Sequence, residues 1–486
     1  MAKFEQTTQS YINGKWIDGD AGRSVKNVNP YDDSLIAEIK LASKSQLKEA
    51  FEYAKEAQKA WGKSSAEERS RVVQSVVDYL NEHKDEIVQL ISRETGGSIL
   101  KGNIEHQLAV EVVEEALNYT DKIDEVEEVP GGPEGKVNKI YRKPIGVVST
   151  ISPFNFPLNL SLRSIIPAIA LGSSVVHKPG ADVGIIAGVV IAKAFEHAGL
   201  PKGVFNMILT DSKEVGDEMF ENPIPELISF TGSTAVGRHI GSIAGYHLKG
   251  LALELGGNNP FVVLSDADVD AAVNAAVFGT FIHQGQICMC INRIIVHKDL
   301  YETFIEKFTD KVKGLPYGDT ADPNTIIGPL INQKQLKKAE EFIENAKSTG
   351  ARVVLEGKLH GNVMSPSIFA DVDNDSDIAQ TEIFGPTALV LKASGDDEAM
   401  EMAGETEHGL TSAIFTSDLE KGEQLGVALD TGMTHINDQT VNDAPNIPFG
   451  GTKGSGVGRF GNPWIVDEFT KMKWVSVQKK ERVFPF

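Results

Sequence analysis

Both cysteines of the chain lie in one stretch, Phe281-Ile282-His283-Gln284-Gly285-Gln286-Ile287-Cys288-Met289-Cys290. An alanine-rich segment predicted to be helical, 268–281, precedes Cys288, and an apolar run predicted to be a buried strand, 291–296, follows it. Between these elements, Gly285 marks a polar turn where the backbone must bend sharply or approach another group closely. A thiol on such a turn is positioned to attack a group in a cleft, although a lone cysteine is more often a small buried hydrophobe.

A carboxylate in a second stretch, Leu251-Ala252-Leu253-Glu254-Leu255-Gly256-Gly257-Asn258-Asn259-Pro260, favours the reactive interpretation. Glu254 interrupts an otherwise apolar, strand-like run and is followed by two glycines. A charge in such a place is costly unless it is paired or protonated, so the pKa of Glu254 should rise towards the working range of a general base.

The composition is that of an ordinary globular protein, and its charge limits the kinds of partner that it can bind. A chain of 486 residues is too long for one core, so two or three domains are expected. The 47 basic and 68 acidic residues give a net charge of −21, which argues against nucleic acid and anionic membranes as partners. The chain starts without an apolar signal region, and no apolar run is long enough to span a bilayer. Two cysteines alone make neither a disulfide framework nor a zinc site, so we expect a cytoplasmic protein with reduced thiols and no metal.

Three local signals predict where the first elements begin. Asn13-Gly14 suits the turn of a hairpin over 11–16. Ser43 with Gln46 and Ser65 with Glu68 have the spacing of helix capping boxes.

From residue 145 to 263 the chain alternates short apolar runs with helical stretches. The predicted strands are 146–149, 174–177, 204–208 and 227–230, and the predicted helices are 162–171, 184–197 and 235–244. This βαβ rhythm indicates a parallel sheet with helices on both faces and ligands at the carboxyl ends of its strands. The usual Gly-x-Gly-x-x-Gly is absent. Gly232 and Gly237 mark a strand-to-helix junction in its place, a weak signal alone, although a helix N-terminus suits a pyrophosphate.

Together, the two stretches resemble those of the NAD(P)-dependent aldehyde dehydrogenase superfamily. Leu253–Gly257 matches its glutamate signature and Gly285–Cys288 matches its cysteine signature, within a resemblance that covers nearly all 486 residues. It implies an α/β, aldehyde dehydrogenase-like fold with a Rossmann-type parallel-sheet cofactor domain, a second α/β catalytic domain and a small β oligomerisation hairpin. We place the NAD(P)-binding domain at 1–119 and 143–255, the catalytic domain at 256–455, and the oligomerisation segments at 120–142 and 466–486.

The oligomerisation segments have strand-like sequences that look exposed. Charged, alternating residues surround a Pro-Gly-Gly-Pro turn in 120–142, and Trp474–Val477 is a second exposed strand candidate. Such edges invite pairing, and the resemblance implies that this hairpin meets another subunit. We therefore expect pairing between subunits in a homodimer or homotetramer.

The resemblance also implies roles for individual residues. Cys288 would be the nucleophile and Glu254 its base, with Asn155 and the Cys288 N–H stabilising the oxyanion. The cofactor, NAD or NADP, would meet Ser152, Lys178, Ala181, Gly232, Ser233, Gly256, Glu382 and Phe384. Judged singly, Asn155 is a turn residue, Glu382 a loop carboxylate, and Phe384 a packed aromatic. Cys290 is expected to be structural.

The choice between NAD and NADP depends on one departure from the family pattern. Many NAD-preferring relatives carry a glutamate three residues after the lysine, where this chain has Ala181. A glutamate there would bind ribose hydroxyls and repel a 2′-phosphate, so its absence leaves NADP open. His177 is a further candidate for positive charge near Lys178.

Within the superfamily, Asn159–Ser164 and His435–Asp443 look like the branch acting on benzaldehyde and vanillin. On one helical face, Asn159 and Arg163 would meet ring hydroxyl or methoxy groups, against an apolar wall of Phe156, Ile287 and Met289. Equally, Arg163 would pair with a nearby carboxylate and never meet substrate.

Other functions stay open at this point. The chain is alternatively an aliphatic or semialdehyde dehydrogenase of the same superfamily. A coenzyme-A-acylating relative normally lacks the glutamate present here as Glu254. A structural protein would have little reason to keep Cys288 with Glu254, and a cofactor-free thiol hydrolase needs neither Glu382 nor Phe384.

Overall fold

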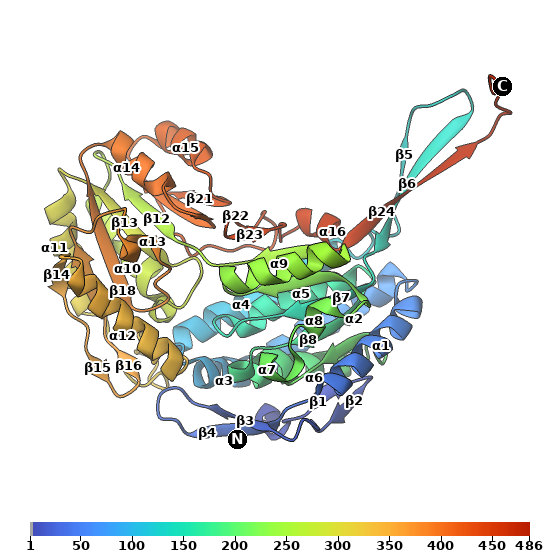
Figure 1. Cartoon of the computed structure of the whole chain (residues 1–486), viewed down its shortest axis with the longest axis horizontal. Coiled ribbons are helices and arrows are strands. Elements are labelled where there is room, and N and C mark those ends of the chain that lie inside the picture. Colours follow the sequence, from blue (N-terminus) through green and yellow to red (C-terminus); the bar gives the residue numbers. More distant parts are fainter. Residues whose placement is uncertain (1–2) are drawn as a thin grey trace.

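The computed structural model describes residues 3–486 and shows two α/β lobes with a projecting arm (Figure 1). The first lobe is built on an eight-stranded sheet of order β2-β1-β9-β8-β7-β10-β11-β23, and the second lobe on a seven-stranded sheet of order β14-β17-β18-β13-β12-β20-β21. In the first sheet the five adjacent strands β9-β8-β7-β10-β11 are parallel. In the second sheet the six adjacent strands β17-β18-β13-β12-β20-β21 are parallel. Parallel pairing and helical crossovers are what the alternating sequence predicted.

The strands of the first sheet are β1 Ser10–Ile12, β2 Lys15–Ile17, β7 Val147–Ile151, β8 Ser174–Lys178, β9 Phe205–Met207, β10 Pro225–Thr231, β11 Gly250–Glu254 and β23 Gly456–Val457. Its principal helices are α1 Lys44–Trp61, α2 Ala66–Glu82, α3 Lys84–Thr95, α4 Ile99–Glu115, α5 Pro157–Ala170, α6 Val190–His197, α9 Thr234–His247 and α16 Trp464–Glu468. Short helices α7 Ser212–Val215 and α8 Glu218–Glu221 and the hairpin of β3 Ser24–Val28 with β4 Leu35–Lys40 complete this lobe.

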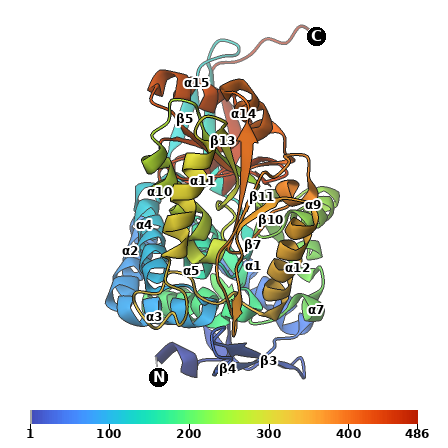
Figure 2. The ribbon, with the colours of Figure 1, turned by 90° about the vertical axis from the view of Figure 1, so that its left-hand side faces the viewer.

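The second sheet consists of β12 Asn259–Val263, β13 Ile291–His297, β14 Arg352–Leu355, β17 Ser367–Ala370, β18 Thr387–Ala393, β20 Thr411–Phe415 and β21 Met433–Ile436. Its helices are α10 Val269–Phe281, α11 Tyr301–Lys313, α12 Gln333–Ser348, α13 Asp377–Gln380, α14 Asp396–Gly404 and α15 Leu419–Ala428. Figure 2 shows α10 and α11 on one side of this sheet and α12 on the other.

Alternate residues of each central strand face opposite layers, which places a core on both faces of each sheet. In β7, Val148 joins the cluster of α5 and α6, whereas Val147 joins the cluster of α1. In β12, Phe261 packs with α10 and α11, whereas Val262 packs with α12 and α14. Strands buried on both faces explain why these runs are continuously apolar in the sequence.

Local sequence signals place the first elements correctly. Asn13 and Gly14 have φ of 51° and 72° in the turn between β1 and β2. Ser43 and Gln46 form the reciprocal capping box of α1, and Ser65 accepts the Glu68 N–H at the start of α2.

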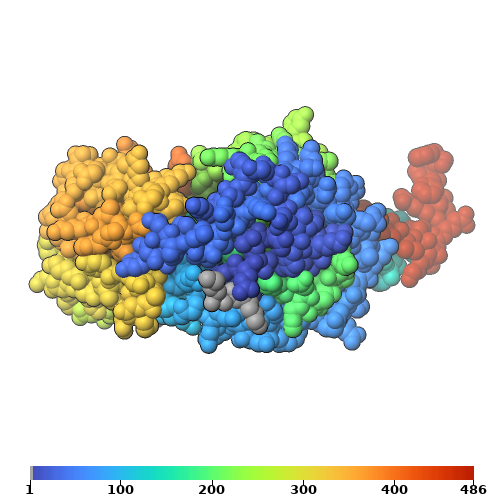
Figure 3. Space-filling model, turned by 90° about the horizontal axis from the view of Figure 1, so that it is seen from below, coloured from blue at the N-terminus to red at the C-terminus, as the bar shows by residue number. Residues whose placement is uncertain are grey.

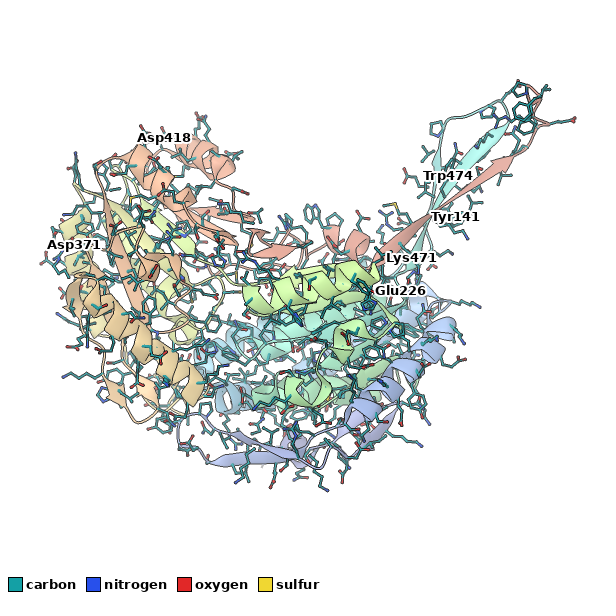
Figure 4. The ribbon with its side chains drawn as sticks, viewed as in Figure 1. Tyr141, Glu226, Asp371, Asp418, Lys471 and Trp474 are labelled. Carbon is teal, nitrogen blue, oxygen red and sulfur yellow. The ribbon has the colours of Figure 1, made fainter. Side chains whose placement is uncertain are left out.

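The arm is a three-stranded sheet of β24, β6 and β5, with β5 at Val126–Val129, β6 at Lys136–Pro144 and β24 at Thr470–Gln478. It extends beyond the first lobe, as Figure 3 shows from below, and Lys471 pairs with Glu226 at its base, with Nζ to Oε2 at 2.6 Å (Figure 4). The expected pairing of the hairpin with the C-terminal strand between subunits needs correction, because β24 pairs with β6 of its own chain along its whole length. Val466 and Phe469 are buried in the main core, so the arm begins at Thr470 rather than at 466.

The two lobes also touch at the N-terminal side. Asn362 of the second lobe donates a hydrogen bond from Nδ2 to the carbonyl of Pro30, between β3 and β4, at 2.9 Å. Across residues 3–486, none of the helices is long and apolar enough to cross a membrane.

Candidate active site

Cys288 follows a sharply bent loop that two neighbouring loops hold in place. His283, Gln284 and Gly285 have successive positive φ angles of 50°, 54° and 73°. A Cβ at Gly285 would lie 2.2 Å from the Gly385 carbonyl oxygen, so this position requires glycine. Gln284 Nε2 donates to the carbonyls of Gly96 and Pro329, each at 2.8 Å. The close approach predicted for the turn is thus present, and it fixes the start of the Cys288 segment.

The Cys288 thiol is only partly exposed and is protonated at rest. Burial and the nearby negative charges of Glu382 and Glu254 raise its pKa to about 12. Cys290 is buried, and burial raises its pKa too, in line with a structural side chain.

Glu254 ends β11 in the first lobe and is 3% exposed. Burial raises its pKa to about 8, although the positive charges of Arg163 and Arg459 act in the opposite direction. Its Oε1 is buried without a hydrogen-bond partner among the described residues. The predicted shift into the range of a general base is therefore present.

Two cavities meet at the thiol. One of about 150 Å³ and one of about 410 Å³ are both lined by Asn155, Thr231 and Cys288. Asn155 lies just before α5, and its Oδ1 accepts the Phe156 N–H at 3.0 Å, which leaves its Nδ2 group available to a ligand. Thr231, which ends β10 beside Glu254, was missed by sequence reasoning because nothing in its surroundings marks it.

The larger cavity has the features of a dinucleotide site. Ser233 is the N-cap of α9, and its side chain makes no cap hydrogen bond, so the first N–H groups of this helix remain for a pyrophosphate. A Cβ at Gly256 would lie 2.7 Å from Glu382 Oε2, so glycine keeps this wall open. Glu382 accepts the Gly257 N–H at 3.2 Å, and burial raises its pKa to about 7. Gly232 and Phe384 also line this cavity, as do Gln335 and Lys338, which sequence reasoning missed because they lie on the otherwise ordinary polar face of α12.

Three predicted cofactor residues lie outside the lining of that cavity. Ser152 and Lys178 lie together at the carboxyl ends of β7 and β8, where the Ser152 N–H donates to the Lys178 carbonyl at 3.4 Å. Ser152 Oγ accepts the hydroxyl of Ser161 at 2.7 Å. Ala181 begins the short helix η3 Ala181–Val183 immediately after β8.

The idea that His177 adds positive charge near Lys178 is wrong. His177 is fully buried in β8, and its ring nitrogens bond with Thr150 Oγ1 at 2.8 Å and with the Ala187 carbonyl at 3.0 Å. Burial lowers its pKa to about 3, so the ring is neutral. The alternation of a strand placed this side chain in the core rather than at the ligand.

The smaller cavity is mostly apolar. Its apolar wall contains the three predicted side chains, Phe156, Ile287 and Met289. It also contains apolar side chains that were missed, namely Ile104, Leu108, Leu160, Phe278, Ile282, Val441 and Phe449. Ile104 and Leu108 are four apart on α4, a helical spacing visible in the sequence, but only the fold shows which site they face.

Asn159 and Arg163 both line this cavity. Arg163 Nη2 pairs with Asp443, and its guanidinium lies 4.0 Å from the ring centroid of Phe449. Burial lowers the pKa of Arg163 to about 10, so it stays cationic. Arg163 Nη1 and Asn159 Oδ1 are buried without partners among the described residues. The ion pair that one alternative predicted for Arg163 is present, and Arg163 also lines the cavity, so its contact with substrate stays a prediction.

Within residues 3–486, no group of three or more His, Cys, Asp or Glu side chains is arranged to hold a metal ion.

Comparison with known proteins gives one consistent result. The sequence model of the aldehyde dehydrogenase family matches residues 16–475. AldY of Bacillus subtilis, provisionally named an aldehyde dehydrogenase, is 61% identical over 99% of this chain and 100% of its own. Vanillin dehydrogenase of Corynebacterium glutamicum is 45% identical, covering 97% and 98% of the two chains. The crystal structure of an NAD-dependent benzaldehyde dehydrogenase from the same organism is 42% identical and superposes with a TM-score of 0.89, over 97% and 98% of the two chains.

Proposed function

The chain belongs to the aldehyde dehydrogenase family, and from that premise we propose that it oxidises aromatic aldehydes of the benzaldehyde or vanillin type to carboxylic acids. Oxidation of an aldehyde with NAD or NADP is the activity of the family to which it belongs. The proposal concerns the aromatic ring of the substrate and the roles of the individual residues.

The cavity beside Cys288 is the observation that carries the proposal. An apolar protein cavity of about 150 Å³ is large enough to bind benzene, and this one has the same volume. Its walls are aliphatic and aromatic, as ring binding requires. Asn159 Oδ1 and Arg163 Nη1 offer one acceptor and one donor without partners, which suits a ring hydroxyl or methoxy group. The relatives named as vanillin and benzaldehyde dehydrogenases support the same class.

Cys288 would begin the reaction by adding to the aldehyde carbon. Since the thiol has a pKa of about 12 and Glu254 one of about 8, the proton has to leave as the S–C bond forms, and the Glu254 carboxylate is the base that takes it. The carbonyl electron pair moves to the oxygen. Asn155 Nδ2 and the Cys288 N–H would stabilise that oxyanion, and losing one such donor typically costs about 3 kcal/mol in the transition state.

When bound, NAD(P) would supply the acceptor for the hydride that leaves the substrate carbon as the oxyanion collapses. The lining residues named above, Ser233, Gly256, Glu382 and Phe384, would hold it in the larger cavity. Once Glu254 has released the proton from Cys288 to solvent, its carboxylate would take a proton from water, whose oxygen adds to the thioester carbonyl carbon on Cys288. The C–S bond breaks, the acid leaves, and the thiolate recovers its proton.

An aldehyde panel assayed with each cofactor tests the substrate class. Benzaldehyde and vanillin are compared with hexanal and succinic semialdehyde by the absorbance of reduced nicotinamide. We expect kcat/KM to favour the aromatic aldehydes by about tenfold or more. Asn159→Leu should lower kcat/KM for vanillin more than for benzaldehyde, which has no ring substituent to bind. A preference for hexanal or for the semialdehyde would overturn the aromatic assignment and leave the family activity intact.

A further inference from the structure

A fully buried ion pair lies next to Phe156, which lines the smaller cavity. Lys101 and Glu105, one turn apart on α4, are both 0% exposed, and Lys101 Nζ contacts Glu105 Oε2. Neither side chain lines either cavity. Two buried charges are costly even when paired, so their placement calls for a structural or functional reason.

Glu105 joins α4 to the start of α5. Its Oε1 accepts the Leu158 N–H at 2.7 Å and the Asn159 N–H at 3.4 Å. The first N–H groups of a helix have no partner inside the helix, and the N-cap residue of α5, Phe156, provides no side-chain acceptor. The Glu105 carboxylate takes that place from another helix, where its charge also suits the positive end of the helix dipole.

Lys101 touches the other side of the same segment. Its Nζ lies 4.6 Å from the ring centroid of Phe156, a cation–π distance. The ring of His283, in the bent loop before Cys288, meets Phe156 edge-on at 6.2 Å. A Cβ at Gly97 would lie 2.9 Å from Lys101 Cδ and 3.1 Å from His283 Nδ1, so both groups lie against the same glycine and leave no room there for a side chain. Lys101 therefore packs between the loop that carries the thiol and the loop that carries Asn155.

We propose that Glu105 is a positioning residue for Asn155, acting through the first turn of α5, and that Lys101 serves to neutralise its buried charge. The inference rests on the proposed role of Asn155 at the oxyanion. Asn155 is two residues before Pro157, the first residue of α5, and its Oδ1 is already held by the Phe156 N–H. With Leu158 and Asn159 held by Glu105, the backbone on the helical side of Asn155 is fixed as well. A displacement of about 1 Å in such a group can slow catalysis by about a hundredfold.

Two matched double variants separate the acceptor from the charge. Lys101→Met with Glu105→Gln removes both charges and keeps an oxygen for the Leu158 N–H, whereas Lys101→Met with Glu105→Met removes both charges and the acceptor. The two proteins have the same net charge and nearly equal side-chain volume. The readout is the burst of reduced cofactor, with whichever aldehyde the wild type uses best, beside cofactor affinity and Tm. We expect the Gln variant to stay within about threefold of the wild-type burst rate and the Met variant to lose about tenfold to a hundredfold, with cofactor affinity unchanged.

A double-mutant cycle with Asn155→Ala tests the route of the effect. If Glu105 acts through Asn155, the Met variant should slow the burst by less than about twofold once Asn155 is already removed. Equal slowing in both backgrounds, or a Met variant as fast as the wild type, would overturn the positioning role. A wild-type burst in Asn155→Ala would instead overturn the oxyanion role, and the positioning role with it. Should the Met variant fail to fold, Glu105→Asp, which keeps the charge and withdraws the acceptor by one methylene, enters the same cycle with the same expectations.

Discussion

At the scale of single residues, the nucleophile is a weaker acid than the group proposed to deprotonate it. Cys288 has a pKa of about 12 and Glu254 one of about 8, and burial is the main cause of both shifts. The free thiol is therefore unreactive until an aldehyde arrives and the developing oxyanion is stabilised. Reactivity then depends on the geometry of Cys288, Glu254 and Asn155 rather than on a resident thiolate.

Cys288→Ala should abolish aldehyde oxidation, because Cys290 is buried behind it and does not line either cavity. NAD(P) binding, followed by quenching of protein fluorescence, should stay close to that of the wild type. Cys290→Ala is the matched control and should retain most of the activity. Turnover by a protein whose sole thiol is Cys290 would show that the nucleophile is wrongly assigned.

The pH dependence of kcat follows from Glu254. A base with a pKa of about 8 is mostly protonated at neutral pH, so the fraction of carboxylate, and with it kcat, should rise as the pH increases through about 8. The profile is measured between about pH 6 and 10, with aldehyde and cofactor saturating. In Glu254→Gln the rise should vanish along with most of kcat. A rise that persists unchanged in Glu254→Gln would assign the titration to another group.

At the scale of secondary structure, local signals in the sequence predicted the elements whose ends are decided locally. Asn13-Gly14 and Ser43 with Gln46 were sufficient, since the turn and the cap lie within a few residues. Helix α5 was predicted to begin at 162 but begins at Pro157. Pro157 at its first position is a local helix-start signal that the prediction did not use. Its N-terminal acceptor, Glu105, is 53 residues away from Leu158 in the chain, and no local pattern marks it.

In the candidate site, too, the features that depend on local sequence were predicted, and those that depend on tertiary packing were not. The two stretches around Glu254 and Cys288 predicted the raised pKa of the carboxyl group, and the structure places both side chains in the lining of one cavity. The partner of Arg163 stayed undecided because Asp443 is 280 residues away. Which face of a strand or helix meets the ligand depends on tertiary packing, and the inward-facing His177 shows the error that follows when packing is unknown.

Ala181 begins η3 immediately after β8, at the position where the family resemblance implies a glutamate in many NAD-preferring relatives. Ribose hydroxyls prefer an acceptor, whereas a 2′-phosphate prefers donors and cations such as Lys178. We expect activity with both cofactors, within about a hundredfold or about 2.7 kcal/mol of each other. Ala181→Glu should weaken NADP selectively by like-charge repulsion, and Ala181→Gln, which adds the volume without the charge, should not. Equal losses for both cofactors, or no use of NADP by the wild type, would place Ala181 away from the 2′ position.

At the scale of the whole molecule, the arm exposes large apolar side chains that a folded chain normally buries. Met472, Trp474 and Val477 of β24 are 65%, 63% and 41% exposed, and Figure 4 shows Trp474 out on the arm, away from both lobes. Unpaired strand edges and exposed apolar side chains favour association with another copy.

We therefore expect at least a dimer by light scattering at micromolar concentration. Trp474→Asp should weaken the association. Phe486→Asp, which likewise replaces an exposed aromatic side chain by a carboxylate but at the C-terminus, should not. A wild-type monomer under these conditions would rule out association through the arm.

The two lobes contribute different parts of one site. Glu254 and Asn155 come from the first lobe and Cys288 from the second, so the chemistry requires the cleft between them. The most direct test of this account is the intact mass of Glu254→Gln after mixing with benzaldehyde and NAD(P). Because Glu254 is the proposed base in both halves of the reaction and the attacking water has no other evident base, hydrolysis should be slowed more than hydride transfer. One equivalent of reduced cofactor should therefore form before hydrolysis, and a benzoyl group should remain on Cys288, located by peptide mapping. A full steady-state rate with no acyl adduct, or an adduct on any other residue, would contradict it.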